Sequence, residues 1–446
     1  MRVLVFHGYM LRGTGSNIYN VNLARALAGL GHEVHLLCQD REVRIEGVQI
    51  HNPDIHGLLP VYVKDPYDGF EVKAFPELTE AELERYIEAN VSAVRGVAEA
   101  VGGVDAALAN HLVMGPAVLA RAGIGPFAAK VHGSALEYTV KPHPRFLPYA
   151  EEGMKAASGV LVGSGHTAES LWAALPDVPG LREKTRLGPP GVDLAEFRPG
   201  RDRESLVAFV GKLIVSKGVD LLIAAWPLVR AAHPEAKLQI AGYGEYEGGL
   251  RRLLAALERG DLDQAREIAR LGWALEGGEE KPLPVLSAFL AQPPEGYLEA
   301  ARGSAGSVEF IGRLEHDEVA ALLARAEAMV MPSTFPEAFG MVAVEAAACG
   351  ALPVSAGHSG MLEVSRQLAA SLPGEVGRLT SFAVEPGAVE AIAARLDGWL
   401  ALPQAERQQA RRALVETVQR LWSWEGVARG VLAASRAELE GLPRPA

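Results

Sequence analysis

Short apolar segments alternate with amphipathic stretches along most of the chain, and turn-forming residues bound each apolar segment. The pattern is clearest near the start, where apolar residues 2–6 precede a glycine-rich loop at 8–15, a helical stretch and a second apolar segment at 34–38. The helical stretch carries three apolar residues that we expect to face inward: Ile18, Val21 and Leu27. This order of segments predicts a β-loop-α-β unit.

The same alternation continues through the first half of the chain and restarts in the second. Helices are predicted from Lys217 to about Ala232 and near residues 318–325. Further strands are predicted at residues 106–109, 127–131, 159–162, 207–210, 238–241, 308–311 and 328–331. Strands that alternate with helices form parallel sheets with helices on both faces. The predicted fold class is therefore α/β, with doubly wound, Rossmann-like parallel sheets.

A stretch rich in proline and glycine, residues 186–203, divides the two halves. Such a stretch sustains neither a long helix nor a central strand. Because a domain ordinarily has roughly 100 to 200 residues, the length of the chain also favours division. We expect an N-terminal domain at residues 1–200 and a C-terminal domain at residues 201–424.

Two segments depart from the alternation. Residues 257–307 are rich in charge and proline, and we interpret them as an insertion in the second domain. Residues 404–442 are predicted to be helical, and the part from about 425 to 446 is expected to pack back on the first domain. Apolar residues that would support this packing are Leu421, Trp422, Trp424, Val427, Val431 and Leu432.

Composition and charge narrow the classes of function. Apolar residues make up 49% of the chain and charged residues 22%, which is typical of a globular protein. The formal net charge of −12 disfavours electrostatic binding of nucleic acid. No apolar run approaches the roughly 20 residues of a membrane span, and the N-terminal apolar stretch is too short for a signal peptide. We expect a cytoplasmic protein without a nucleic-acid partner; a peripheral position at the inner membrane face and a homo-oligomer stay open.

Cysteine and acidic motifs give no reason to expect a metal or a disulfide framework. Cys38 and Cys349 lack the close spacing of a zinc or redox motif and are interpreted as small core residues. Asp261 and Asp263 imitate an acidic metal motif, but such patterns are common at solvated helix starts. No metal and no cofactor are predicted.

Two glutamates follow the predicted strand that ends at Met331. Glu337 lies in a Pro/Gly loop, and Glu345 lies in the helix expected after it. A strand, a loop and a helix in this order place the helix N-terminus at the carboxyl edge of the sheet, where free amides and the helix dipole attract phosphate. The amides would come from Gly340, Met341 and Val342.

The residues around Glu345 are nearly all apolar, so we expect this helix to be buried. A carboxylate there is costly unless it is hydrogen-bonded, and sugar hydroxyls would provide such bonds. One of the two acids is expected to hold ribose hydroxyls and the other the hydroxyls of a sugar.

Lys212 and Lys217 form a second signal, again between a predicted strand and a predicted helix. Cations at a helix N-terminus oppose the helix dipole, so their position does not favour helix stability. They are well placed to hold a diphosphate. Lysines and a helix N-terminus can stabilise the charge on a departing nucleoside diphosphate without a metal.

The N-terminal loop and two histidines are further candidates. Gly13 and Gly15 invite comparison with a dinucleotide-binding loop, but Ile18 replaces the third glycine of that fingerprint. His132 follows the predicted strand 127–131, at the carboxyl edge of the sheet, and His111 is a weaker candidate after another strand.

Several motifs in this order resemble the retaining GT-B glycosyltransferases often called group 1 transferases. The resemblance covers nearly the whole chain. It includes Val-His-Gly at His132, Gly-Val-Asp-x-x-x-Phe-x-Pro from Gly191, Gly-Lys-x-x-x-x-Lys-Gly from Gly211, Ala-Gly-x-Gly from Ala241, Phe-Ile-Gly-Arg-Leu from Phe310, the Glu-x7-Glu pair and Trp424-Glu425. The resemblance implies two Rossmann-like domains that face a central cleft.

The resemblance also implies roles for single residues. Lys212 and Lys217 would hold the donor diphosphate, Glu345 the ribose and Glu337 the transferred sugar, while His132 would contact the sugar near the reacting centre. The remaining donor-binding candidates are Gly15, Gly340, Met341, Val342, Arg313 and Leu314. Lys212 departs from the family, which commonly has arginine there, and so does Pro190, where asparagine is common.

The implied reaction moves a hexose from a nucleotide diphosphate sugar, with a UDP-sugar favoured, to a hydroxyl of an unidentified small molecule, lipid or glycan. The acceptor attacks on the face that the nucleotide leaves, and the leaving phosphate takes the acceptor proton. Two alternatives stay open: a nucleotide-sugar epimerase of the same fold and a noncatalytic nucleotide-sugar-binding protein. An NAD-dependent dehydrogenase is disfavoured by Ile18 and by the lack of a convincing ribose-binding acid after the second strand, although Asp40 is nearby.

Overall fold

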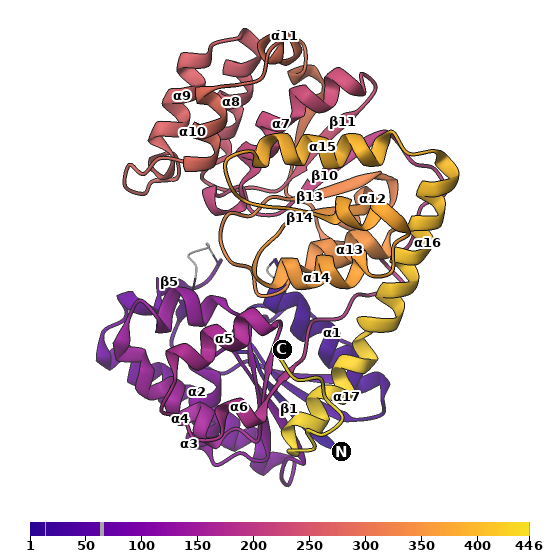
Figure 1. The fold of residues 1–446 in the computed structure, drawn as a ribbon. Coiled ribbons are helices and arrows are strands. Elements are labelled where there is room, and N and C mark those ends of the chain that lie inside the picture. The colour runs from indigo at the N-terminus through magenta and orange to yellow at the C-terminus, as the bar shows by residue number, and fades with distance from the viewer. Residues whose placement is uncertain (14, 63–66, 446) are drawn as a thin grey trace. The chain divides into compact units, whose positions relative to one another are not determined.

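The computed structural model describes residues 1–13, 15–62 and 67–445, and the chain divides into two compact units. Unit 1 comprises Met1–Gly191 together with Trp422–Ala446, and unit 2 comprises Val192–Leu421. Figure 1 shows this division through its colours, since the yellow C-terminal end of the chain returns to the indigo and magenta unit. Thr14, part of the predicted glycine-rich loop, lies outside the described residues.

Unit 1 is built on a parallel sheet with the strand order β3-β2-β1-β6-β7-β8-β9. Its strands are β1 (Arg2–Phe6), β2 (Glu33–Leu37), β3 (Val48–His51), β6 (Ala106–Asn110), β7 (Phe127–Val131), β8 (Gly159–Val162) and β9 (Thr185–Leu187). A separate parallel pair consists of β4 (Leu58–Val61) and β5 (Glu71–Ala74). The strands β6, β7 and β8 are buried along their whole length because both faces of the sheet are covered.

Alternate residues of β1 enter two different cores, one on each face of this sheet. Val3 and Val5 face a core that includes Tyr19 and Trp424, whereas Leu4 and Phe6 face the other core. The helices of unit 1 are α1 (Gly15–Gly29), α2 (Glu80–Ala100), α3 (Gly115–Ala122), α4 (Leu147–Ala156), α5 (Gly165–Ala174), α6 (Leu181–Lys184) and α17 (Trp424–Ser435).

Unit 2 repeats the architecture with a parallel sheet in the order β12-β11-β10-β13-β14-β15. Its strands are β10 (Leu206–Val210), β11 (Lys237–Ala241), β12 (Val308–Gly312), β13 (Ala328–Met331), β14 (Leu352–Ala356) and β15 (Ser381–Phe382). Trp226 and Trp399 are among the largest fully buried side chains of this unit.

Ten helices are described around this second sheet. They are α7 (Val219–Ala232), α8 (Glu247–Arg259), α9 (Leu262–Leu271), α10 (Pro284–Ala291), α11 (Tyr297–Ala301), α12 (His316–Arg325), α13 (Met341–Ala348), α14 (Ser359–Ala369), α15 (Ala388–Leu400) and α16 (Gln404–Leu421). Among the residues that the structure describes, no helix is both long and apolar enough to cross a membrane.

The strands predicted from apolar runs are confirmed to within one residue at each end, and the α/β alternation is confirmed with them. Short strands such as β9 and β15 were not predicted, because three and two residues carry no readable pattern. The inward stripe predicted for α1 is partly wrong, since Ile18 and Val21 are only half-buried. Tyr19, Asn20 and Leu23 lie inward instead, because the start of α1 buries polar side chains that bond to the sheet edge.

The division into units differs from the predicted boundaries by a few residues at each crossing. Residues 192–200 belong to unit 2, where Phe197 is buried with its ring 4.7 Å from that of His316. The helical stretch near the C-terminus is two helices, broken where Ser423 caps α17 by accepting the amide of Gly426 at 3.2 Å. Leu421, expected to be packed, is 43% exposed because it ends α16 at the crossing between units.

Candidate functional site

The loop after β10 carries Lys212 and Lys217 along the carboxyl edge of the unit 2 sheet. Lys217 ends a 3₁₀ turn, Val215–Lys217, and Gly218, which directly precedes α7, has the left-handed conformation with φ of +65°. A Cβ on Gly218 would lie 2.0 Å from the carbonyl oxygen of Pro332. Only glycine therefore allows this loop to touch the loop after β13.

That contact brings two predicted residues together. Lys217 Nζ forms an ion pair with Glu337 Oε1, and Ser333 Oγ donates to the same carboxylate oxygen at 2.9 Å. The two charged side chains are 26% and 23% exposed, so the pair is accessible to a ligand without unfolding. We call Lys217, Ser333 and Glu337 the lysine–glutamate cluster.

The loop that carries Glu337 is held by the start of α14. The amide of Glu337 donates to Ser359 Oγ at 3.0 Å, and the amide of Gly360 donates to the carbonyl of Glu337 at 3.0 Å. His358 Nε2 lies 2.8 Å from the carbonyl oxygen of Ser333, to which it donates. These supporting residues were missed from the sequence. Their signal was a Gly-His-Ser-Gly run directly after β14, at the same sheet edge.

Glu345 is buried inside α13, as predicted from its apolar neighbours. Burial, together with the nearby charge of Glu196, raises the pKa of Glu345 to about 8. The carboxyl group therefore holds its proton in a large share of molecules at neutral pH and can both donate and accept a hydrogen bond. Paired donor and acceptor hydroxyls, such as those of a ribose, suit such a group.

The N-terminus of α13 begins at the same edge. Gly340 has φ of +104° and precedes Met341, the first residue of the helix. The first amides of an α-helix have no acceptor within it. Ala343 is an early exception, since its amide donates to the carbonyl of Gly340 at 3.1 Å. The amides proposed for phosphate, those of Gly340, Met341 and Val342, are therefore concentrated where the helix dipole is positive.

Three other predicted residues lie at this edge. Lys212 is half-buried directly after β10. Arg313 follows β12, lies over the ring of Tyr243 at 5.6 Å and pairs with Glu315 at 3.3 Å. Leu314 is half-buried beside it.

In unit 1, His132 ends a buried chain of amides and imidazoles that begins at the glycine-rich loop. Asn20 Nδ2 donates to His7 Nδ1 at 3.0 Å, and Asn110 Nδ2 donates to Asn20 Oδ1 at 2.7 Å. His132 Nε2 lies 2.8 Å from Asn110 Oδ1, and His7 Nε2 lies 3.0 Å from Asn17 Oδ1. We call His7, Asn17, Asn20, Asn110 and His132 the histidine–asparagine chain.

The direction of these bonds fixes the state of both imidazoles. Because Asn20 donates to His7 Nδ1, the proton of His7 is on Nε2. Asn110 Nδ2 donates its hydrogens to Asn20 Oδ1 and to the carbonyl oxygen of Phe6. The contact of His132 Nε2 is with Asn110 Oδ1, which can only accept, so His132 carries its proton on Nε2. Burial lowers the pKa of His7 to about 4 and that of His132 well below its usual value. Neutral His132 therefore keeps the lone pair on Nδ1.

His111 lies against this chain in a conformation unusual for its residue type, with φ of +67°. Its ring centroid is 5.0 Å from that of His132 and 4.8 Å from that of Tyr62. Both of its ring nitrogens are buried without a hydrogen-bond partner in the described part of the chain. Such atoms cost about 1–3 kcal/mol each when unsatisfied, so they mark a place that suits a polar ligand.

Gly15 opens α1 at the carboxyl end of β1 and is exposed. Gly13, before it, has φ of +94°.

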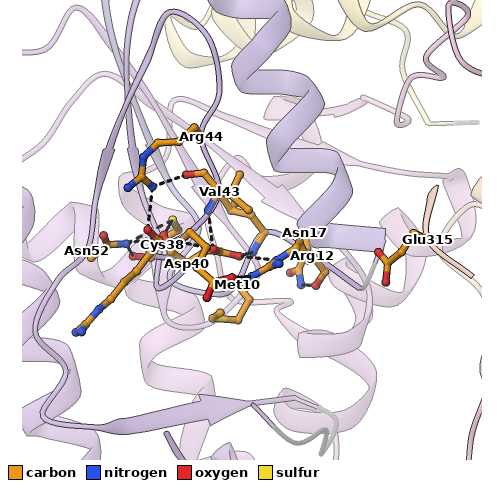
Figure 2. A network of polar contacts seen from close by, with 12 residues as sticks. Met10, Arg12, Asn17, Cys38, Asp40, Val43, Arg44, Asn52 and Glu315 are labelled. Atoms are coloured by element: carbon orange, nitrogen blue, oxygen red, sulfur yellow. Dashed lines mark hydrogen bonds and ion pairs between the residues drawn. The ribbon is translucent and has the colours of Figure 1, made fainter. Parts of the chain in front are cut away.

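Asp40 is the remaining residue that could support a dinucleotide interpretation, but its carboxylate bonds to other groups of the protein. Figure 2 shows its carboxylate between the chain and Arg12: Oδ1 accepts the amides of Glu42 and Val43 at 3.0 Å, and Oδ2 lies 3.4 Å from Arg12 Nε. Burial alone would raise the pKa of Asp40, but these amides and Arg12 outweigh it and lower the pKa. Asp40 therefore braces the glycine-rich loop, and its carboxylate is not available to a ribose.

The two aspartates that imitate a metal motif have structural partners. Asp261 caps α9 by accepting the amide of Gln264 at 3.0 Å, and Asp263 lies 3.4 Å from Arg266. Within residues 1–13, 15–62 and 67–445, no group of three or more His, Cys, Asp or Glu side chains is placed to hold a metal ion.

Comparison with known proteins gives matches to both halves of the chain. The family model described as Glycosyl transferases group 1 matches residues 194–261 and 296–416, and the model described as Glycosyltransferase Family 4 matches residues 13–196. Glycogen synthase of Mycobacterium tuberculosis is 32% identical over 277 residues, which is 60% of this chain and 52% of that protein. The chain thus spans about half the length of this curated relative.

Solved structures match over nearly the whole chain. Sucrose-phosphate synthase from Thermosynechococcus elongatus has a TM-score of 0.60 at 20% identity and covers 96% of both chains. The Anabaena protein HepE, solved in complex with UDP and glucose, has a TM-score of 0.59 at 16% identity and covers 99% of this chain and all of that one, 100%. These likenesses confirm the predicted GT-B fold class of parallel-sheet α/β domains.

Proposed function

Since the chain belongs to the group 1 glycosyltransferases, we propose that it moves a sugar from a nucleoside diphosphate donor to a hydroxyl acceptor, with retention at the anomeric carbon. The observation that carries the proposal is the lysine–glutamate cluster at the carboxyl edge of the unit 2 sheet. Ligands of open α/β sheets bind at this edge. A nucleotide sugar has an anionic diphosphate, which a cation can bind, and a hydroxylated sugar, which a neighbouring carboxylate can bind.

The proposed division of labour follows from the chemistry of each group. Lys217 and Lys212 hold the diphosphate, together with the amides at the start of α13. Glu337 accepts hydrogen bonds from the sugar, and Glu345 binds the ribose. These cations act most strongly on the departing diphosphate, whose charge grows as its bond to the sugar breaks, so they lower the barrier instead of merely binding substrate.

In the reaction, the bond between the anomeric carbon and the diphosphate oxygen breaks, and the acceptor oxygen bonds to the anomeric carbon on the same face. The acceptor proton passes to the leaving phosphate oxygen. His132, neutral and oriented by Asn110, is proposed to contact the sugar. The unsatisfied ring nitrogens of His111 suit hydroxyls of the acceptor.

A UDP-sugar is the proposed donor, and HepE, which was solved with UDP and glucose, supports this choice at the level of fold. Several other features stay predictions. They are the acceptor class, the role of residues 257–307, the exact domain boundaries, a homo-oligomeric state and a location in the cytoplasm or at the inner membrane face.

The test is to incubate the purified protein with UDP-, GDP- and ADP-sugars, alone and with polyol, glycan and glycolipid acceptors. We expect nucleoside diphosphate release that depends on the acceptor, and a product with the anomeric configuration of the donor by NMR. An inverted product would refute the mechanism. An epimer formed from donor alone would favour the epimerase, and binding without turnover in every mixture would favour the noncatalytic protein.

A further inference from the structure

Residues 262–295, which the family models leave unmatched, contribute a carboxylate to the loop of residues 211–218. This loop carries Lys212 and Lys217, and we call it the lysine loop. It consists of α9, the 3₁₀ turn Trp273–Glu276 and α10. Glu276 Oε2 accepts the amide of Val215 at 2.6 Å, across 61 positions of sequence. Val215 is the first residue of the 3₁₀ turn that ends in Lys217.

This bond replaces a local cap. The residue before the turn, Ile214, has no side chain able to accept a hydrogen bond and forms no side-chain cap. A carboxylate on a backbone amide at the start of a turn is a charge-assisted bond, shorter and stronger than a neutral one. Glu276 therefore supplies from another segment an acceptor for a first-turn amide, which has no acceptor within the turn itself.

The rest of the lysine loop is fixed by backbone contacts on both sides. The amide of Leu213 donates to the carbonyl of Tyr243 at 2.8 Å, and the amide of Thr334 donates to the carbonyl of Ser216 at 2.9 Å. Among these ties, the one to Val215 depends on a side chain from outside the matched family regions.

Glu276 is itself held in place by a closed loop. The amide of Trp273 donates to the carbonyl of Lys281 at 3.1 Å, and the amide of Gly278 donates to the carbonyl of Trp273 at 3.1 Å. Gly272 packs so closely that a Cβ would lie 2.0 Å from the carbonyl oxygen of Lys281. The carboxylate is thus preorganised before any ligand binds.

We propose that Glu276 is a positioning residue for the donor: by capping the turn at Val215, it holds Lys217 where the diphosphate binds. The inference rests on the proposed function. It gives residues 262–295 a role in donor affinity, although they need not touch the donor.

The test compares Glu276→Ala with Glu276→Gln and with Glu279→Ala, a control at an exposed glutamate of the same segment. Loss of one charge-assisted bond should raise the donor KM of Glu276→Ala about tenfold, which corresponds to about 1.4 kcal/mol. The kcat and the acceptor KM should change less than twofold. Glu276→Gln keeps an oxygen acceptor and should recover most of the donor affinity, whereas Glu279→Ala should match the wild type.

Hydrogen exchange provides a second readout that needs no turnover. Peptides that contain Val215 should exchange faster in Glu276→Ala than in the wild type and Glu279→Ala, while peptides from β10 and β13 keep their protection. Unchanged exchange at Val215, or an unchanged donor KM in a folded Glu276→Ala, would overturn the inference. If the wild type turns over no nucleotide sugar, the proposed function fails instead, and the exchange data still decide whether Glu276 caps the turn.

Discussion

Lys217 and Glu337 form an ion pair whose two side chains remain partly exposed. Each neutralises the other in the described structure, yet both are about one quarter exposed. An ion pair of this exposure contributes only about 0–1 kcal/mol to folding. Under the proposed function, its position at the sheet edge therefore matters more for the donor than for the stability of unit 2.

Glu337→Gln tests this balance. We expect kcat/KM for the donor to fall about 100-fold, or about 2.7 kcal/mol of transition-state stabilisation, because Lys217 loses its partner and the sugar loses a charged acceptor. The free energy of unfolding should change by less than about 1 kcal/mol. Steady-state kinetics and denaturant unfolding measure the two quantities.

Glu375→Gln is the matched control, since Glu375 pairs with Arg378 on the open surface of the same unit. It should change neither quantity. Wild-type kcat/KM in Glu337→Gln would remove Glu337 from the site.

Glu345 makes stability depend on pH. Burial raises its pKa from 4.5 to about 8, so the folded state binds its proton more tightly than the unfolded state does. The resulting stability is complete below about pH 4.5 and is lost as the pH rises through 8. Glu345→Gln cannot ionise, so its Tm should exceed that of the wild type by more at pH 8.5 than at pH 5.5. A constant Tm difference across this range would show that Glu345 is not buried as a protonated acid.

At the scale of elements, both candidate sites consist of loops that follow parallel strands, and glycines decide how closely those loops meet. Gly218 is the sharpest case, because its positive φ and the Pro332 carbonyl both exclude a side chain. The contact between the two loops, and with it the lysine–glutamate cluster, depends on this one residue.

Gly218→Ala should therefore separate Lys217 from Glu337. We expect unit 2 to lose about 2–4 kcal/mol of stability through strain and clash, and donor binding to fall at least tenfold. Gly248→Ala is the control, since a Cβ on Gly248 in α8 meets nothing within 4 Å. That change should stabilise the helix slightly, by about 0.5–1 kcal/mol. Calorimetry and donor titration compare them, and equal effects of both variants would contradict this account.

The elements also show where sequence patterns suffice. Strands such as β7 and β13 were predicted at their observed ends, because a continuous apolar run between turn residues has few other interpretations. The stripe of α1 was misassigned, because Asn17 and Asn20 are buried by hydrogen bonds that no hydrophobic pattern reveals. Glu337 could be proposed from the pattern of its loop. Glu276 could not be, since its partner Val215 lies far away in sequence.

At the scale of the whole molecule, the chain leaves unit 1 after Gly191 and returns to it at Trp422. The returning helix α17 packs on α1 and on the strands β6, β7 and β8, and Trp424 packs edge-on against Tyr19 with ring centroids 5.5 Å apart. Gly191 meets the same indole so closely that a Cβ would lie 2.8 Å from it. Unit 1 is therefore complete only when both ends of the chain are present.

Trp424→Ala should destabilise unit 1 by about 3–5 kcal/mol, because it empties a buried indole site. Hydrogen exchange should show lost protection in β1, β6 and β7, with unit 2 unaffected. Leu421→Ala, three residues earlier at a side chain that is 43% exposed, should change little. Equal loss of protection in both units would contradict the division into separate cores.

The discontinuity of unit 1 also orders its folding during synthesis. Residues 1–191 leave the ribosome first, but α17 follows only after residues 192–421 have been made. At about 5–20 residues per second, that delay is roughly ten to fifty seconds. For this time the face of the first sheet that α17 covers stays open, while unit 2 already has its whole sequence. Nascent chains stalled before Trp424 should therefore expose this apolar face of the sheet.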